Sequence, residues 1–253
     1  MKKLLENVAV AALIGLLGAC MVVSVVADAD DPTSIADNVA AVRSGVVHVR
    51  AGGQWQGSGA ILSKDGIVLT ARHVVQDMDQ FTVTLDDGRV FESKAVLADT
   101  ENDVGFILLD LPAGEDISVL PLSEAVKVRA GDTVFIMGSP FGYTNFNSVS
   151  RGIVSALGRD IGTQWDWFCM IQTDSAANPG NSGGPVFNLD NEIIGILVAG
   201  QSEGVNYSVP VVRFNETIDT VRQMLYMQRF KVPSVPKIDH GHYKIDYEMQ
   251  VVE

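Results

Sequence analysis

The residues best suited to chemistry lie in the segment 172–185, QTDSAANPGNSGGP. Ser182 stands there among three glycines, Gly180, Gly183 and Gly184. Glycines let backbone N–H groups turn inward around a reacting carbonyl oxygen, and such preorganised donors stabilise an oxyanion by roughly 3 kcal/mol each. A serine hydroxyl is a poor nucleophile unless a base accepts its proton. The segment therefore indicates nucleophilic catalysis by Ser182, provided that the chain also supplies a histidine and an orienting acid.

Of the four histidines, His73 suits the role of the base. It lies in the segment LTARHVV, at the end of an expected strand and among small residues. His48 lies inside an alternating strand pattern, where a packed or an exposed imidazole is the ordinary interpretation. His240 and His242 lie in the C-terminal tail and are expected to be solvated.

Asp103 suits the role of the acid, because it opens the apolar run DVGFILL at 103–109. A carboxylate at the mouth of an apolar strand is half-desolvated, which favours a group that holds an imidazole in one tautomer. Asp99 and Asp110 are nearby competitors, and both are more typical of solvated turns. The order His73, Asp103, Ser182 matches that of chymotrypsin-like proteases.

Short β-rich runs separated by Gly, Asp and Asn turns must position these residues. A first set of six expected strands covers 46–50, 54–62, 67–70, 81–85, 90–97 and 104–109. A second set covers 133–137, 148–157, 168–172, 185–187, 193–198 and 204–209. Strands of this length and spacing predict an all-β fold of sandwiches or barrels rather than a parallel α/β fold.

The end of the chain has a different pattern. Asn215 can cap a helix over about 215–228, in which Ile218, Val221 and Leu225 share one face. The tail, residues 231–253, then alternates apolar and polar side chains over 243–251, which predicts an extra strand.

The N-terminus has the pattern of a membrane element. Residues 8–27 contain one polar side chain and no charge, and twenty helical residues rise about 30 Å, the thickness of a bilayer core. Basic residues precede the run and acidic residues follow it, so the rest of the chain is expected on the extracytoplasmic side. For residues 1–27 three interpretations stay open: a retained signal anchor, a lipoprotein signal acylated at Cys20, and a cleaved signal peptide. Residues 28–37 read as a linker.

Composition excludes several classes of protein. The 253 residues carry a formal net charge of −13 and no Lys/Arg cluster, so a nucleic-acid partner is not expected. Two cysteines are too few for a disulfide scaffold, and Cys169 is expected to be a thiol in the core. The chain has no His-x-x-x-His pair and no cysteine cluster, so we expect no metal and no cofactor.

Several motifs, in order and in spacing, resemble those of the HtrA/Deg family of trypsin-like serine proteases. They are GSG at 57–59, the His73 segment, NDV at 102–104, GSPFG at 138–142, SRGIVSALG at 150–158 and the segment 172–185. The resemblance covers about residues 38–226. It implies a protease domain over 38–230, made of two six-stranded antiparallel β-barrels at about 38–115 and 120–215, with the site in the cleft between them.

The resemblance also implies roles for residues. His73 would be the general base and then acid, Asp103 its orienting partner, and Ser182 the nucleophile. The backbone N–H groups of Gly180 and Ser182, together with that of Asn181, would form the oxyanion hole.

The specificity pocket implied by the resemblance is lined by Ala177, Ile196, Leu197 and Val198. None of these positions is acidic, so we expect cleavage after small or medium apolar residues rather than after Lys or Arg.

The function implied is a membrane-anchored serine endopeptidase that cuts exported or misfolded polypeptides. A catalytically silent protease fold that only binds polypeptides, as a holdase, is the alternative. Only about 25 residues follow the matched stretch, so a PDZ domain, common in the family, is not expected. Homo-oligomerisation stays open, because the aromatic residues that assemble family trimers are missing between residues 28 and 42.

Overall fold

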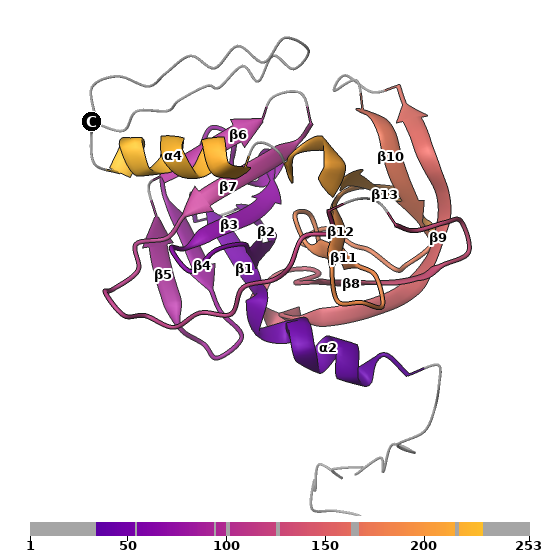
Figure 1. The fold of residues 1–253 in the computed structure, drawn as a ribbon, viewed down its shortest axis with the longest axis horizontal. Coiled ribbons are helices and arrows are strands. Elements are labelled where there is room, and N and C mark those ends of the chain that lie inside the picture. Colours follow the sequence, from indigo (N-terminus) through magenta and orange to yellow (C-terminus); the bar gives the residue numbers. More distant parts are fainter. Residues whose placement is uncertain are drawn as a thin grey trace, which may run out of the picture. The chain divides into compact units, whose positions relative to one another are not determined.

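The computed structural model describes residues 34–229, except 54, 94, 100–101, 125–126, 163–166 and 216–217. The described residues from Ile35 onward belong to one compact unit that is mostly β-structure (Figure 1). It begins with a short helix, α2 (Ala36–Val42), and a 3₁₀ turn, η2 (Arg43–Gly45), that leads into the first strand. α2 is tied to a distant part of the chain, because Asn38 Nδ2 donates to Leu189 O (2.8 Å).

The first half of the unit is a curved antiparallel sheet. Its described strands are β1 (Val46–Ala51), β2 (Trp55–Ile61), β3 (Ile67–Ala71), β4 (Phe81–Thr84), β5 (Val90–Ser93), β6 (Ala95–Asp99) and β7 (Val104–Leu108). Their spatial order is β5-β4-β1-β2-β3-β7-β6. The two edge strands, β5 and β6, are separated in sequence by Lys94 alone. The chain itself therefore joins the two ends of the sheet, which curls into a half-barrel.

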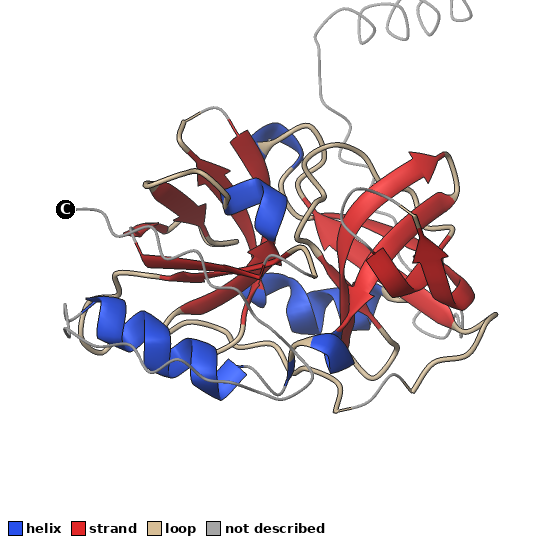
Figure 2. Cartoon of the chain, turned by 90° about the horizontal axis from the view of Figure 1, so that it is seen from above, coloured by secondary structure: helices blue, strands red, loops and turns tan. Residues whose placement is uncertain are grey.

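The second half is a closed barrel of the order β10-β13-β12-β11-β8-β9 (Figures 1 and 2). Its strands are β8 (Thr133–Gly138), β9 (Ser148–Ile161), β10 (Trp167–Thr173), β11 (Pro185–Phe187), β12 (Ile193–Ser202) and β13 (Val205–Pro210). The 3₁₀ turns η3 (Tyr143–Asn145) and η4 (Val211–Arg213) flank these strands. Where β8 and β11 pair, the rings of Phe135 and Phe187 stack with centroids 4.9 Å apart, and both side chains belong to the core cluster that also contains the buried residues of the first sheet.

Two α-helices cover the first sheet. α3 (Arg72–Val75) is a single turn directly after β3, and α4 (Ile218–Arg229) packs against β6 and β7. Val221 and Leu225 of α4 are fully buried, as expected for apolar residues four positions apart on one helix face. Because α4 covers β7, that strand is apolar and buried along its whole length rather than alternating.

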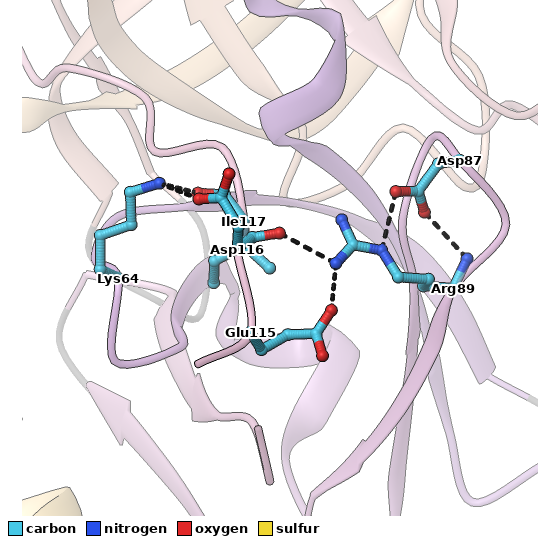
Figure 3. A network of polar contacts seen from close by, with 6 residues as sticks. All are labelled: Lys64, Asp87, Arg89, Glu115, Asp116 and Ile117. Carbon is cyan, nitrogen blue, oxygen red and sulfur yellow. Dashed lines mark hydrogen bonds and ion pairs between the residues drawn. The ribbon is translucent and has the colours of Figure 1, made fainter. Parts of the chain in front are cut away.

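The segment that joins the two halves is held by an exposed polar network (Figure 3). Lys64 Nζ donates to Asp116 Oδ1 (2.7 Å) and to Ile117 O (2.6 Å). Arg89 donates to Asp116 O (2.9 Å) and to the Glu115 carboxylate. Side chains of the first sheet thus fix the path along which the chain crosses to the barrel.

The structure confirms the all-β chymotrypsin-like fold, the second six-stranded barrel and the C-terminal helix. It corrects the first barrel, where six strands were expected. The expected strand 90–97 is divided at Lys94 into β5 and β6, so that one half pairs with β4 and the other with β7. The division makes a seven-stranded sheet of the described strands.

Other expectations fall outside the described residues: the membrane segment 8–27, Cys20 and the tail 231–253 with its strand 243–251. No helix in the described part of the chain combines the length and the apolar character needed to cross a membrane.

Candidate active site

The register of two neighbouring strands brings His73 and Asp103 together. β3 ends at Ala71 and β7 begins at Val104, and these two residues are paired across the sheet. One position further the ladder continues, because Arg72 N–H donates to Asp103 O (3.0 Å). His73 follows in the single turn of α3, so its side chain and backbone both lie beside Asp103.

Both carboxylate oxygens of Asp103 are used by His73. Oδ2 accepts a hydrogen bond from the ring Nδ1–H (2.7 Å), and Oδ1 accepts one from the backbone N–H (2.9 Å). The Asp103 side chain is 6% exposed, whereas that of His73 is 35% exposed. Because an ionised carboxylate only accepts hydrogen bonds, the ring proton is held on Nδ1 and the lone pair on Nε2. This is the tautomer that a general base needs.

Ser182 comes from a tight turn of the second barrel that is bonded to the first sheet. Ser58 N–H of β2 donates to Ser182 O (2.8 Å), and Ser58 Oγ donates to Gly180 O (2.8 Å). Gly57 makes this approach possible, since a Cβ there would lie 2.8 Å from Ser182 O and 2.7 Å from a methyl of Val74 in α3. The serine turn and the histidine helix therefore meet over the same stretch of β2.

A cavity of about 260 Å³ contains both His73 and Ser182. The other residues around it come from β2, from α3, from the loop between β8 and β9 and from the loop between β10 and β11: Trp55, Gln56, Val74, Phe141, Gly142, Pro179 and Gly180. With Asp103 bonded to the far ring nitrogen of His73, the structure places all three predicted catalytic side chains at one site.

The backbone before Ser182 presents two amide donors. Pro179 O accepts a hydrogen bond from Phe141 N–H (2.7 Å). The C=O and N–H of a trans peptide unit point in opposite directions, so Gly180 N–H points away from Phe141. Within the described residues neither Gly180 N–H nor Ser182 N–H has a hydrogen-bond partner.

The third amide expected at the oxyanion hole is placed differently. Asn181 N–H donates to Asn178 O (3.0 Å) and closes the turn. Gly180 has φ +99°, and a Cβ there would lie 2.4 Å from Ser139 O, so the turn depends on glycine at this position. The geometry leaves the amides of Gly180 and Ser182 for an oxyanion.

A larger cavity, of about 650 Å³, also borders Ser182. Three of the four residues expected in the specificity pocket, Ala177, Leu197 and Val198, lie in its wall. The fourth, Ile196, is not among the residues around the cavity; it is fully buried and belongs to the main core cluster. The pairing of β12 with β13 shifts register between Leu197 and Ala199, and this bulge re-aims the residues that follow Ile196.

Sequence reasoning missed Asn206, which lies in the wall of this larger cavity and is only 2% exposed. It belongs to β13, the hydrogen-bonded neighbour of β12. The signal that could have found it is a polar residue inside a strand whose following residues, 207–210, are all buried.

Among the remaining polar residues, His48 is buried at 4% exposure, so its imidazole is packed, one of the two placements that its strand pattern left open. Its Nε2 lies 3.2 Å from Gln56 Oε1, and its ring contacts those of Tyr143 and Phe146. Burial lowers the pKa of His48; the contact with Gln56 opposes this effect, and the charge of Arg50 adds to it.

Two other expectations need correction. Asp99 is not a solvated turn residue: it is 7% exposed and accepts hydrogen bonds from the backbone and side chain of Asn102. Cys169, expected in the core, is exposed, because a backbone of φ +55° and shifts in the β9–β10 register turn it outward.

Comparison with known proteins agrees with this geometry. A model of the trypsin-like peptidase domain matches residues 57–196, more than half of the chain. A probable periplasmic serine endoprotease, DegP-like, from Brucella suis is 42% identical over 170 residues, which are 65% of this chain and 32% of that protein. The corresponding protein of Pseudomonas fluorescens is 40% identical over 163 residues, 62% of this chain and 33% of its own length. The chain thus spans about a third of the length of these curated relatives.

Solved structures agree with the sequence matches. The HtrA-type protease AlgW with a tripeptide superposes with a TM-score of 0.68 at 30% identity, covering 76% of this chain and 64% of that one. The serine endoprotease from Yersinia pestis superposes with a TM-score of 0.65 at 29% identity, covering 77% and 68%. The chain belongs to the family of trypsin-like peptidase domains and is, within it, of the HtrA type.

Proposed function

We propose that the protein is a serine endopeptidase in which Ser182 is the nucleophile, His73 the general base and acid, and Asp103 the residue that orients the imidazole. The observation that carries the proposal is the two-point attachment of His73 to Asp103 beside a cavity that also contains Ser182. This arrangement supports a general base, His73, whose ring Nε2 is free to accept the proton of the Ser182 hydroxyl.

In the proposed reaction, Ser182 Oγ attacks the carbonyl carbon of the scissile peptide bond and its proton passes to His73 Nε2. The negative charge that forms on the carbonyl oxygen is stabilised by the N–H groups of Gly180 and Ser182. His73 then gives the proton to the leaving amide nitrogen as the C–N bond breaks, which leaves an acyl group on Ser182. Water, deprotonated by His73, attacks this ester, releases the carboxylic acid and restores the serine.

The substrate is proposed to be an extended polypeptide with a small or medium uncharged side chain before the cut. Among the described residues, β12 after Leu197 pairs with β13 alone, so the other edge of that stretch can accept a peptide backbone, whereas Leu197 itself is bonded to Gly183 and Gly184. The same stretch borders the 650 Å³ cavity, where Ala177, Leu197 and Val198 supply an apolar wall. This arrangement supports a side chain of the peptide entering the cavity while the backbone pairs with β12.

We propose the cellular location of the protein from its relatives and from the N-terminal sequence pattern together. Relatives named as periplasmic endoproteases support an extracytoplasmic protease domain that acts on exported or misfolded proteins. The apolar run at residues 8–27 supports attachment to the membrane.

The test is labelling of the full chain by a fluorophosphonate, followed by mass determination, with Ser182→Ala as the control. We expect one label per chain that Ser182→Ala abolishes, and a near-complete loss of labelling and of casein hydrolysis in His73→Ala. Absence of Ser182-dependent labelling in the folded protein would refute the proposed function.

A further inference from the structure

Asn206 is a buried polar residue in the wall of the larger cavity. It lies on β13, opposite Gly200 of the neighbouring strand β12 in the strand register, and both residues border the cavity. At 2% exposure it has almost no contact with bulk water. Its side chain has no part in the mechanism proposed above.

The orientation of the Asn206 amide follows from its hydrogen bond. Nδ2 lies 2.6 Å from Ser175 O, and because a carbonyl only accepts, the group facing Ser175 must be the NH₂. Oδ1 therefore points the other way, and a Cβ placed on Gly200 would lie 2.9 Å from it. Gly200, which has no side chain, leaves the space in front of this oxygen open.

Asn206 Oδ1 has no hydrogen-bond donor among the described residues. Some other buried groups without partners, such as the hydroxyls of Thr173, Ser175 and Ser208, are completely enclosed. Asn206 Oδ1 is not among those enclosed atoms, so it remains accessible from the cavity that Asn206 borders.

The wall of this cavity has an apolar part, formed by Ala176, Ala177, Leu197, Val198 and Ala199, beside polar residues such as Asn178, Gln201 and Ser202. The one charged residue among the described residues of the wall, Glu203, is exposed at its rim. A ligand that fills the cavity and displaces water leaves Oδ1 unpaired unless the ligand supplies a donor, and an unpaired buried acceptor is costly.

We infer that Asn206 is a specificity-determining residue, which favours substrates whose side chain before the cut is uncharged and ends in a hydrogen-bond donor. This inference rests on the proposed function and narrows it. Threonine is preferred over valine, which has the same shape, and glutamine over methionine. In each pair only the first member can donate to Oδ1 while its apolar part contacts Leu197 and Val198.

The experiment measures kcat/KM of the full chain on fluorogenic peptides that differ only in the residue before the cut. Two matched pairs are used, Thr against Val and Gln against Met. We expect a preference of about tenfold or more for the donor in at least one pair, since a site built to bond a donor rejects the analogue that lacks it. In Asn206→Leu the ratio of that pair should fall to about one, because the acceptor is gone.

Two further variants separate specificity from folding. Asn206→Asp keeps an acceptor at the same place, so the ratio should persist even where total activity is lower. Asn38→Leu removes an amide-to-carbonyl hydrogen bond of the same kind far from the cavity and should leave the ratio unchanged. Should Asn206→Leu fail to fold, the ratios of the wild type and of Asn206→Asp still decide the matter.

Equal rates within both pairs in the wild type would overturn the inference, as would a preference for lysine or arginine, or an unchanged ratio in Asn206→Leu. Fluorophosphonate labelling of Ser182 in the same samples distinguishes this failure from that of the proposed function. A labelled enzyme without donor preference refutes only the role of Asn206, whereas an unlabelled one refutes the protease assignment on which the inference rests.

Discussion

Replacing Asp103 by Asn tests the proposed triad at its most constrained point. In the wild type one carboxylate oxygen accepts the backbone N–H of His73 and the other accepts the ring Nδ1–H. Asparagine offers one oxygen and one NH₂, and a backbone N–H can only donate. The amide oxygen must therefore stay at the backbone N–H, which places the NH₂ against Nδ1. The ring then accepts at Nδ1 and carries its proton on Nε2.

With the proton on Nε2, His73 cannot accept the proton of Ser182. In serine proteases with this triad, the same exchange lowers kcat about 10⁴-fold, because the imidazole is held in the wrong tautomer. We expect a loss of the same order here, which corresponds to about 5.5 kcal/mol of transition-state stabilisation. The fold should persist, since Asn fills the same space and keeps the bond to the backbone.

The assay is the rate of fluorophosphonate labelling at pH 7.5, measured together with the melting temperature. Asp99→Asn is the matched control, because Asp99 is a buried carboxylate that bonds Asn102 and not the imidazole. The control should lose stability but label within about tenfold of the wild type. If folded Asp103→Asn also labels within tenfold of the wild type, Asp103 does not orient the base and the reasoning from its geometry is refuted.

Three other predictions concern the surroundings of the triad. Gly180→Ala should lower the labelling rate at least a hundredfold while the circular dichroism spectrum persists. At φ +99° a Cβ would lie 2.4 Å from Ser139 O, so the turn that carries the amides of Gly180 and Ser182 must move. A rate near that of the wild type would exclude the Gly180 amide from the proposed oxyanion hole. Ser58→Ala removes the hydroxyl that donates to Gly180 O (2.8 Å) and accepts from Ser139 N–H (2.9 Å). The free energy of unfolding, measured in urea, should fall by about 1–3 kcal/mol. An unchanged urea midpoint would contradict this prediction. The pKa of His48 is lower in the folded state than its ordinary value of about 6.5, so the unfolded chain takes up the proton first and stability should fall as the pH drops below about 6.5. Between pH 7.5 and pH 5 the melting temperature should therefore fall less in His48→Gln than in the wild type. Parallel curves for the two proteins would show that burial of His48 does not cause the loss of stability.

The sequence was most informative where chemistry and turn signals coincide. The residues His73, Asp103 and Ser182 could be named because each stands beside a strand end or a glycine-rich turn, which are local features. The strands of the second barrel could be predicted for the same reason, since Gly, Asp and Asn separate them, whereas their closure into a barrel was implied by the family resemblance. Their meeting at one cavity depends on register, and a register is visible only once strands are paired.

What escaped prediction depends on backbone details without a local signal. No Gly or Pro separates Ser93, where β5 ends, from Ala95, where β6 begins, so 90–97 is predicted as one strand although its halves pair with different neighbours. The bulge after Ile196 cannot be read from alternation, and this residue was assigned to the pocket from the family resemblance, which does not show the local register. Asn206 needed knowledge of which strand lies next to β12.

The cross-sheet hydrogen bonds of Ser58 show why the two halves must act as one unit. The proposed base, His73, and its proposed orienting acid, Asp103, lie beside strands of the first sheet, and the proposed nucleophile, Ser182, with its amide donors belongs to the barrel half. Three hydrogen bonds join them at Ser58: its N–H to Ser182 O, its Oγ to Gly180 O, and Ser139 N–H to its Oγ. Ser58 is fully buried, so these bonds are shielded from water, and a shift of either half breaks bonds that water cannot replace. The bonds that set the oxyanion turn are thus the same bonds that hold the two halves together, and a change that loosens their contact should lower activity before it unfolds either half.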